Sequence, residues 1–197
     1  MNKDSLSEQD TAKLTWEFNR NFGRMITLVN HAPQVVITML EGAVLGGGFG
    51  LACISDVAIA SKAALFALPE TGLGLVPAQI APFVVSRIGI TQARRLALLG
   101  ARIDGTEAQR LGIAHYVAED AAAMEDRLAN TLKQLRRCAP GANGLTKKLM
   151  LQVGVIGHEA LLDGAADMFA YCLTTQEGQE GTTAFIEKRK PYWADKG

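Results

Sequence analysis

The sequence predicts an α/β protein whose C-terminal part is entirely helical. Short apolar runs rich in β-branched residues alternate with helical patterns over about residues 11–118, and this alternation is typical of an α/β core. From about residue 119 onward every periodic segment is helical, which predicts a helical region over 119–197. The 197 residues contain no repeat, low-complexity tract or linker, so a single domain over 1–197 is expected.

Composition limits the partners and compartments to be considered. The 20 basic and 20 acidic side chains balance, so no net field favours nucleic acid or an acidic membrane surface. No apolar run approaches the roughly 20 residues that span a bilayer, and the polar N-terminus differs from a secretion signal. The three cysteines lack metal-ligand spacing and are expected to be buried, reduced thiols. We therefore expect a cytoplasmic protein with no metal site, no membrane segment and no nucleic-acid partner.

The N-terminal half begins with an amphipathic helix from Thr11 to about Val29, since its apolar side chains recur at helical spacing. The segments expected next are the strand Gln34–Leu40, a helix from the glycine run to Ile54, and the short strands Val57–Ala60 and Leu65–Leu68.

Glycines and capping residues mark the later helices. Gly89 interrupts a helical pattern, which predicts one helix over Ala78–Ile88 and another over Thr91–Leu99. Thr106 and Gln109 have the spacing of a capping box and predict a short helix. The remaining segments expected are the strand His115–Val117 and the helices Asp120–Arg137, Asn143–Val153, His158–Thr175 and Thr182–Lys188.

Three consecutive glycines, Gly46, Gly47 and Gly48, stand between a predicted strand and a predicted helix. Without Cβ atoms the backbone can approach a ligand closely, and the first amides of a helix are unpaired and carry partial positive charge. Such an N–H can stabilise a carbonyl oxygen that gains charge. A tight turn or close packing is the alternative explanation of the run. A nucleotide loop is not supported, because Leu51 replaces the third glycine of G-x-G-x-x-G, and no G-x-S-x-G serine motif occurs.

Glu70 follows Pro69 among leucine and phenylalanine neighbours, whereas most other acidic residues have polar neighbours. Apolar surroundings disfavour the charged form of a carboxyl group and suit it to proton exchange. The alternative is structural: Glu70 caps its loop or pairs with an arginine such as Arg87. Asp56, which precedes a strand, is expected to be a turn or cap residue.

Several motifs in matching order resemble the crotonase family, the enoyl-CoA hydratases and isomerases. The residues that carry the resemblance are Gly42-Ala43-Val44-Leu45-Gly46-Gly47-Gly48, Asp56, Phe66-Ala67-Leu68-Pro69-Glu70, Gly74-Leu75-Val76-Pro77 and Phe185-Ile186-Glu187-Lys188-Arg189-Lys190-Pro191. The resemblance extends from about Asn21 to the C-terminus. It implies the ClpP/crotonase fold, a spiral of ββα turns with a C-terminal helical trimerisation region, and assembly as a homotrimer or a dimer of trimers.

The resemblance also implies an acyl-CoA thioester as substrate, with coenzyme A as part of that substrate and no separate cofactor. Gly47 matches one of the family's two N–H donors to the thioester carbonyl, and Glu70 matches a family acid/base carboxylate. The other residues implied at the substrate are Leu45, Gly46, Gly48, Gly50, Pro69, Leu73, Pro77, Phe185 and Lys188. Of these, Phe185 and Lys188 match C-terminal residues that help to hold CoA, where a lysine charge suits a phosphate.

Three features depart from the family pattern. Many hydratases carry a second glutamate where this chain has Gly50, which favours isomerisation, or hydration of an unusual substrate, by Glu70 alone. Gly50 is also expected to leave room for a bulky or branched acyl group. The run Ala78–Pro82 replaces a glycine-rich segment and is similar to that of hydratases of branched glutaconyl-CoA-type intermediates in isoprenoid catabolism. Nothing before Thr11 matches the family's N-terminal portion, with its strands and second N–H donor. We therefore expect an internal start, a fragment or a naturally shortened homologue. One of the two N–H donors would then be missing, and with it roughly 2–3 orders of magnitude in rate.

Three functions remain open at this point. The first is an acyl-CoA enzyme of the enoyl-CoA hydratase/isomerase type that stabilises a thioester enolate and shuttles a proton with Glu70. The second is a catalytically weak homologue that binds acyl-CoA or forms oligomers. The third is thioester hydrolysis, in which Glu70 activates water.

Overall fold

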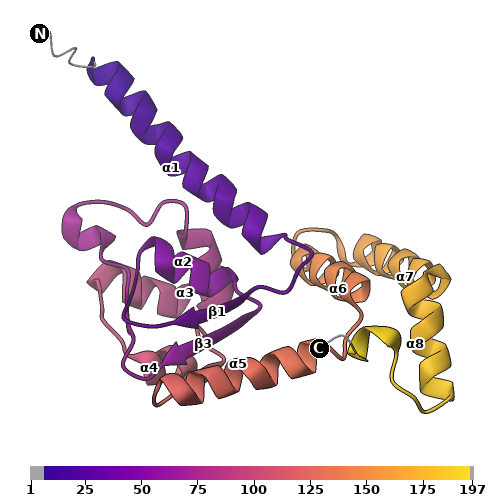
Figure 1. The fold of residues 1–197 in the computed structure, drawn as a ribbon. Helices are drawn as coiled ribbons and strands as arrows, with labels where there is room; N and C mark the ends of the chain where they lie inside the picture. The colour runs from indigo at the N-terminus through magenta and orange to yellow at the C-terminus, as the bar shows by residue number, and fades with distance from the viewer. Residues whose placement is uncertain (1–6, 196–197) are drawn as a thin grey trace, which may run out of the picture. The chain divides into compact units, whose positions relative to one another are not determined.

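A computed structural model describes residues 7–195 of the chain (Figure 1). It divides into two compact units, which we describe separately. The first unit comprises the residues up to Asn30 and Ile37–Met124, and the second comprises His31–Val36 and the residues from Glu125 onward. The predicted boundary near residue 118 thus lies close to an observed division, whereas the single domain stays a prediction.

The first unit repeats a strand–strand–helix sequence. Its elements are β1 (Ile37–Leu40), β2 (Ala43–Leu45) and α2 (Gly47–Ile54), followed by β3 (Val57–Ser61), β4 (Leu65–Ala67), the short 3₁₀ helix η1 (Glu70–Leu73) and α3 (Ala81–Leu99). After α4 (Gly105–Arg110), β5 (Tyr116–Ala118) joins a parallel sheet of order β1-β3-β5, while β2 and β4 form a second parallel sheet. Each ββα turn therefore contributes one strand to each sheet. Successive turns together form a spiral.

The core lies between the sheets and the helices α2 and α3. Phe49 of α2 and Phe66 of β4 are fully buried and meet edge to face, with ring centroids 6.2 Å apart. Burying each such ring stabilises the fold by roughly 1.5–3 kcal/mol. This contact fixes α2 against the strand that leads to Glu70.

Helix α1 (Glu8–Asn30) packs onto this core through its C-terminal half, where Ile26 is completely buried. The side-chain amide of Gln79, just before α3, connects that segment to α1. Its Nε2 donates to Asn19 at 2.8 Å and its Oε1 accepts from Arg20 at 3.4 Å. The N-terminal half of α1 extends beyond the rest of the unit (Figure 1). The predicted amphipathic helix is confirmed, although it begins at Glu8.

The glycine break predicted in the next helical pattern is confirmed. Gly89 has φ 72° and ψ 158° inside α3, so two helical arms meet there at a kink, and the first arm begins at Ala81. The predicted capping box is wrong. Asp104 ends the preceding segment and accepts a hydrogen bond from the Glu107 amide at 2.8 Å, so it caps α4 in place of Thr106.

The second unit is helical, as predicted. Its helices are α5 (Ala121–Leu135), which begins within the first unit, α6 (Pro140–Gln152), α7 (His158–Thr174) and α8 (Gln176–Ile186), followed by the 3₁₀ helix η2 (Tyr192–Asp195). The Glu177 carboxylate accepts hydrogen bonds from the amides of Gly141 at 2.9 Å and Ala142 at 3.3 Å. It thereby satisfies unpaired N–H groups at the start of α6.

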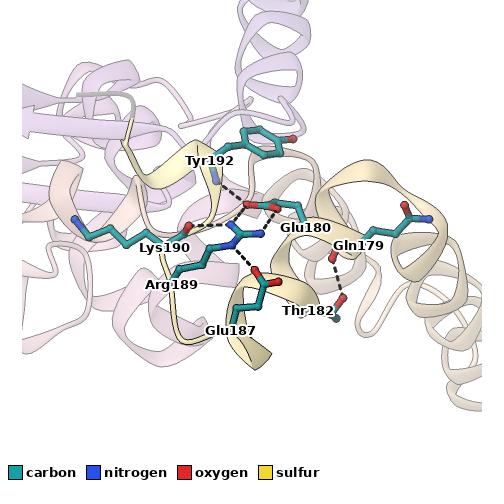
Figure 2. A network of polar contacts seen from close by, with 7 residues as sticks. All are labelled: Gln179, Glu180, Thr182, Glu187, Arg189, Lys190 and Tyr192. Atoms are coloured by element: carbon teal, nitrogen blue, oxygen red, sulfur yellow. Dashed lines mark hydrogen bonds and ion pairs between the residues drawn. The ribbon is translucent and has the colours of Figure 1, made fainter.

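The chain reverses after α8 through an ion-pair network (Figure 2). Arg189 donates to both carboxylate oxygens of Glu180, at 2.6 and 2.8 Å, and from Nε to Glu187 at 2.6 Å. Its amide donates to the Ala184 carbonyl at 3.0 Å, which is the long hydrogen bond of a Schellman motif. Lys188 occupies the left-handed position of this motif, with φ 55°, which is usually a glycine position.

The cysteine prediction holds in part. All three thiols are free, and burial raises the pKa of Cys53 to about 12, but Cys138 is exposed and Cys172 only partly buried. The expectation of three buried cysteines is therefore wrong. Among residues 7–195, no helix combines the length and hydropathy needed to cross a bilayer.

Candidate functional site

The second parallel sheet brings the glycine run and Glu70 to one edge. Leu45, the last residue of β2, pairs with Ala67, the last residue of β4. Parallel strands end at the same edge of a sheet, so the loops that follow β2 and β4 start side by side. The amide of Gly46 extends the ladder by donating to the Ala67 carbonyl at 3.2 Å. Residues distant in sequence therefore form one corner.

The Glu70 carboxylate lies directly against this corner. A Cβ atom at position 46 would stand 2.9 Å from Oε1 of Glu70, closer than real Cβ contacts allow. Gly46 has φ 49° and ψ −112°, a conformation that side-chain-bearing residues rarely adopt. The backbone turn thus favours glycine at position 46, and a side chain there would displace the carboxylate of Glu70.

The second carboxylate oxygen has no partner. Among the described residues, Oε2 of Glu70 is buried and makes no hydrogen bond. Leaving a buried polar group unsatisfied costs about 1–3 kcal/mol, so such an atom calls for an explanation. A ligand or water at the corner would supply the missing partner.

Helix α2 begins at this corner with Gly47. The first amides of a helix have no intrahelical partner, and no side chain caps this end. A Cβ at position 47 would lie 2.9 Å from Cζ of Phe22, so the ring of Phe22 covers one side of Gly47, whereas nothing lies within 4 Å of the corresponding point at Gly48. The Gly48 side of the helix start is therefore open to a ligand. The role of Phe22 was missed, because its sequence pattern indicates only an apolar helix face.

The backbone around Glu70 is anchored at two points. Glu70 opens η1, and its carbonyl accepts from the Leu75 amide at 2.9 Å. The hydroxyl of Thr71 donates to the Ala97 carbonyl on α3 at 2.8 Å. Arg87 bonds backbone carbonyls elsewhere, so the alternative in which it pairs with Glu70 is not what the structure shows.

The other predicted site residues lie at three different places: beside the corner, in an apolar pocket, and in the second unit. Leu45, Gly46, Gly48 and Pro69 flank the corner directly in sequence, and Leu73 ends η1 with a 71% exposed side chain. Pro77 lines an apolar pocket of about 160 Å³ together with Leu68 and residues of both arms of α3. Phe185, which is exposed, and Lys188 belong to the second unit.

The room expected beside Gly50 is occupied. Gly50 is buried, and a Cβ there would run into the side chain of Ile80 and approach Cδ1 of Ile26 to 3.1 Å. Ile80 itself is 3% exposed. The absence of a side chain at Gly50 therefore serves packing and leaves no space for a branched acyl group. Position 50 alone could not reveal this, because the filling side chains come from other elements.

No group of three or more His, Cys, Asp or Glu side chains within residues 7–195 is arranged to hold a metal ion. The arrangement instead combines unpaired helix amides with one carboxylate whose Oε2 is buried. These groups can stabilise a negative oxygen and transfer a proton.

This fold and corner define a protein of the crotonase class. A family model described as enoyl-CoA hydratase/isomerase matches residues 4–196, so the chain belongs to that family. It is similar to the solved structure of Pseudomonas aeruginosa AtuE, with a TM-score of 0.92 and 56% identity over 95% of this chain and 75% of that one. The predicted ClpP/crotonase fold is thereby confirmed.

Two named relatives are hydratases. The chain is 34% identical to enoyl-CoA hydratase ACTT6 of Alternaria alternata over 61% of this chain and 41% of that protein. It is 33% identical to the short-chain-enoyl-CoA hydratase of Clostridium acetobutylicum over 87% of this chain and 64% of that protein. The chain thus spans less than two-thirds of the length of each.

Proposed function

We propose that the chain acts on acyl-CoA thioesters as an enzyme of the enoyl-CoA hydratase/isomerase type. The observation that carries this proposal is the unpartnered, buried Oε2 of Glu70 beside the start of α2. Family membership supports the substrate class, since the matching family is described by enoyl-CoA chemistry. Coenzyme A enters as part of the substrate, without a separate cofactor.

The amide of Gly47 is proposed to donate to the thioester oxygen. In isomerisation, the Glu70 carboxylate removes a proton from a carbon next to the double bond, and the electron pair moves through the conjugated system onto that oxygen as an enolate. Glu70 then returns the proton to a different carbon, and the double bond shifts. In hydration, Glu70 takes a proton from a water molecule while the water oxygen bonds to the β carbon. Glu70 then delivers that proton to the α carbon. Losing one N–H donor of this kind costs about 3 kcal/mol of barrier.

A single carboxylate is proposed to perform both proton transfers. Ile80 and Ile26 pack over Gly50, the position where the resemblance implies a second glutamate in many hydratases. Water activated from that position would have no space. Any hydration therefore depends on Glu70, which predicts that Glu70→Gln abolishes proton exchange and hydration together.

Deuterium incorporation tests this function directly. The protein is incubated with a trans-2-enoyl-CoA in D₂O, and the thioester is analysed by mass spectrometry and NMR. Deuterium at the α or γ carbon that disappears in Glu70→Gln supports the proposal. Release of free CoA would instead indicate hydrolysis, and binding of the ester without any exchange would indicate a catalytically weak homologue.

Two further features are proposed from the second unit. Phe185 and Lys188 are proposed to contact CoA, supported by the exposed ring and by the lysine held at φ 55° beside the Arg189–Glu180 ion pair. Assembly as a homotrimer or a dimer of trimers is proposed through the helical region, supported by apolar side chains exposed on α7. These are Leu162, Phe169, Tyr171 and Leu173. Sedimentation equilibrium of the purified chain measures the assembly.

A further inference from the structure

The C-terminal end of α2 is held by a half-buried arginine on α3. Arg87 donates from Nη1 to the carbonyl of Ser55, the residue that ends α2, at 3.2 Å. Its Nε donates to the Gly112 carbonyl at 2.8 Å, and its Nη2 to the Ile113 carbonyl at 3.1 Å. One guanidinium thus ties the end of α2 to α3 and to the segment after α4.

This end of α2 helps to set where the opposite end lies, together with the contact between Phe49 and Phe66. A helix of eight residues is too short to be stable alone, so its position depends on tertiary contacts. No side chain caps the Gly46 end. At the other end, the positive guanidinium complements the partial negative charge of the helix C-terminus. A shift of the Ser55 carbonyl would therefore move or tilt the whole helix, including the Gly47 amide.

His115 makes this anchor sensitive to protons. Nη2 of Arg87 lies 3.3 Å from each nitrogen of the His115 ring, and Nδ1 accepts a hydrogen bond from the Ala58 amide at 2.9 Å. That bond requires an unprotonated Nδ1. A proton on Nδ1 would oppose the Ala58 N–H and place a second positive charge beside Arg87.

The surrounding charges favour the neutral ring. Burial and the charge of Arg87 lower the pKa of His115, and Asp56 opposes this effect. Cys53 also faces Arg87, but its raised pKa of about 12 keeps the thiol neutral. The ring of Tyr116 also lies beside His115, with the two ring centroids 6.5 Å apart.

We propose that Arg87 is a positioning residue for the α2 amide donor and that protonation of His115 weakens this positioning. The inference rests on the proposed role of Gly47, and Arg87 itself contacts no substrate. An oxyanion contact is stronger in the transition state than in the ground state, so the loss falls on kcat more than on KM.

The first test compares Arg87→Gln and Arg87→Lys with Arg95→Gln. Arg95 is an exposed arginine on the same helix with its own ion pair to Glu107, which makes it a matched control. Proton exchange into an enoyl-CoA is measured across pH 5–9, normalised to the folded fraction. We expect about a tenfold lower kcat for Arg87→Gln with KM within twofold, a smaller loss for Arg87→Lys, and no change for Arg95→Gln. An unchanged kcat in Arg87→Gln would overturn the positioning role.

The second test uses His115→Gln, whose amide oxygen can still accept from Ala58 but does not titrate. The wild-type kcat is expected to fall more steeply on the acidic side than the kcat of His115→Gln. Hydrogen–deuterium exchange of the α2 amides gives a readout without substrate: it is expected to rise in acid and in Arg87→Gln, relative to α5. If α2 exchange rises as expected but the wild type shows no turnover, the proposed function is wrong while the anchoring of α2 by Arg87 still stands. If α2 exchange stays unchanged both in acid and in Arg87→Gln, the inference is wrong while the proposed function still stands.

Discussion

Replacing Gly46 by alanine perturbs the backbone and the carboxylate at once. The residue has φ 49° and ψ −112°, and forcing a side-chain-bearing residue into such a conformation costs about 1–3 kcal/mol. The new Cβ would lie 2.9 Å from Oε1 of Glu70, so the carboxylate must move by some tenths of an ångström. Since misplacement of reacting groups by 1 Å can cost 10²-fold, we expect about a tenfold loss of activity.

Gly42→Ala is the matched control for this change. Gly42 also has a positive φ, 58°, but nothing lies within 4 Å of its Cβ position. The control should therefore lose stability by about 1–2 kcal/mol through backbone strain alone and keep its activity. Urea unfolding measures the first quantity, and deuterium incorporation from D₂O measures the second. If both variants lost the same fraction of activity, contact between position 46 and Glu70 would not control the chemistry.

Three other predictions concern packing, protonation and the C-terminal turn. Gly50→Ala is expected to destabilise the protein by about 1–3 kcal/mol through overpacking against Ile80. Combined with Ile80→Ala, it should lower the urea midpoint by less than the sum of the two single losses. The pKa of His115 is lowered from 6.5 on folding, so the unfolded chain binds more protons than the folded chain below that pH. The unfolding free energy should therefore fall as the pH drops below 6.5. His115→Gln should flatten the slope of unfolding free energy against pH. Lys188→Gly should raise the melting temperature, because glycine removes about 1 kcal/mol of backbone strain at φ 55°. The same change should raise KM for the CoA ester. An unchanged KM would show that Lys188 does not bind CoA.

Elements with a strong local signal were predictable. The kink at Gly89 and the helix start at the glycine run follow from residues that allow few alternatives. The strand β2 (Ala43–Leu45) was missed, because three residues between glycines carry no periodicity and become a strand only by pairing with β4. The cap of α4 was misassigned to Thr106, since polar residues stand on both sides of the helix start and only the folded chain shows that Asp104 accepts the amide.

The last helix shows a second limit of local patterns. Only Thr182–Lys188 was predicted to be helical, because Gly178 and Gly181 weaken the helical pattern upstream. The structure begins α8 at Gln176, with the Thr175 hydroxyl accepting from the Gly178 amide at 3.1 Å. A Cβ at Gly181 would come within 3.1 Å of the Trp193 ring. Gly181 therefore allows close packing against Trp193, a reason that the helical pattern itself does not show.

The same dependence governs the site itself. Neither Gly46 nor Glu70 indicates its partner, and their proximity arises from the parallel register in which Leu45 pairs with Ala67. Antiparallel pairing would carry Glu70 to the opposite end of β2, and a shift of the register by one residue would move the carboxylate by about 3.3 Å along the strand. The buried contact between Phe49 and Phe66 opposes such a shift, because Phe66 would have to leave the core and face the other side of the sheet. The apolar core thus holds the acid at the amide corner, and conservative changes at Phe66 should disturb the chemistry without touching a reacting group.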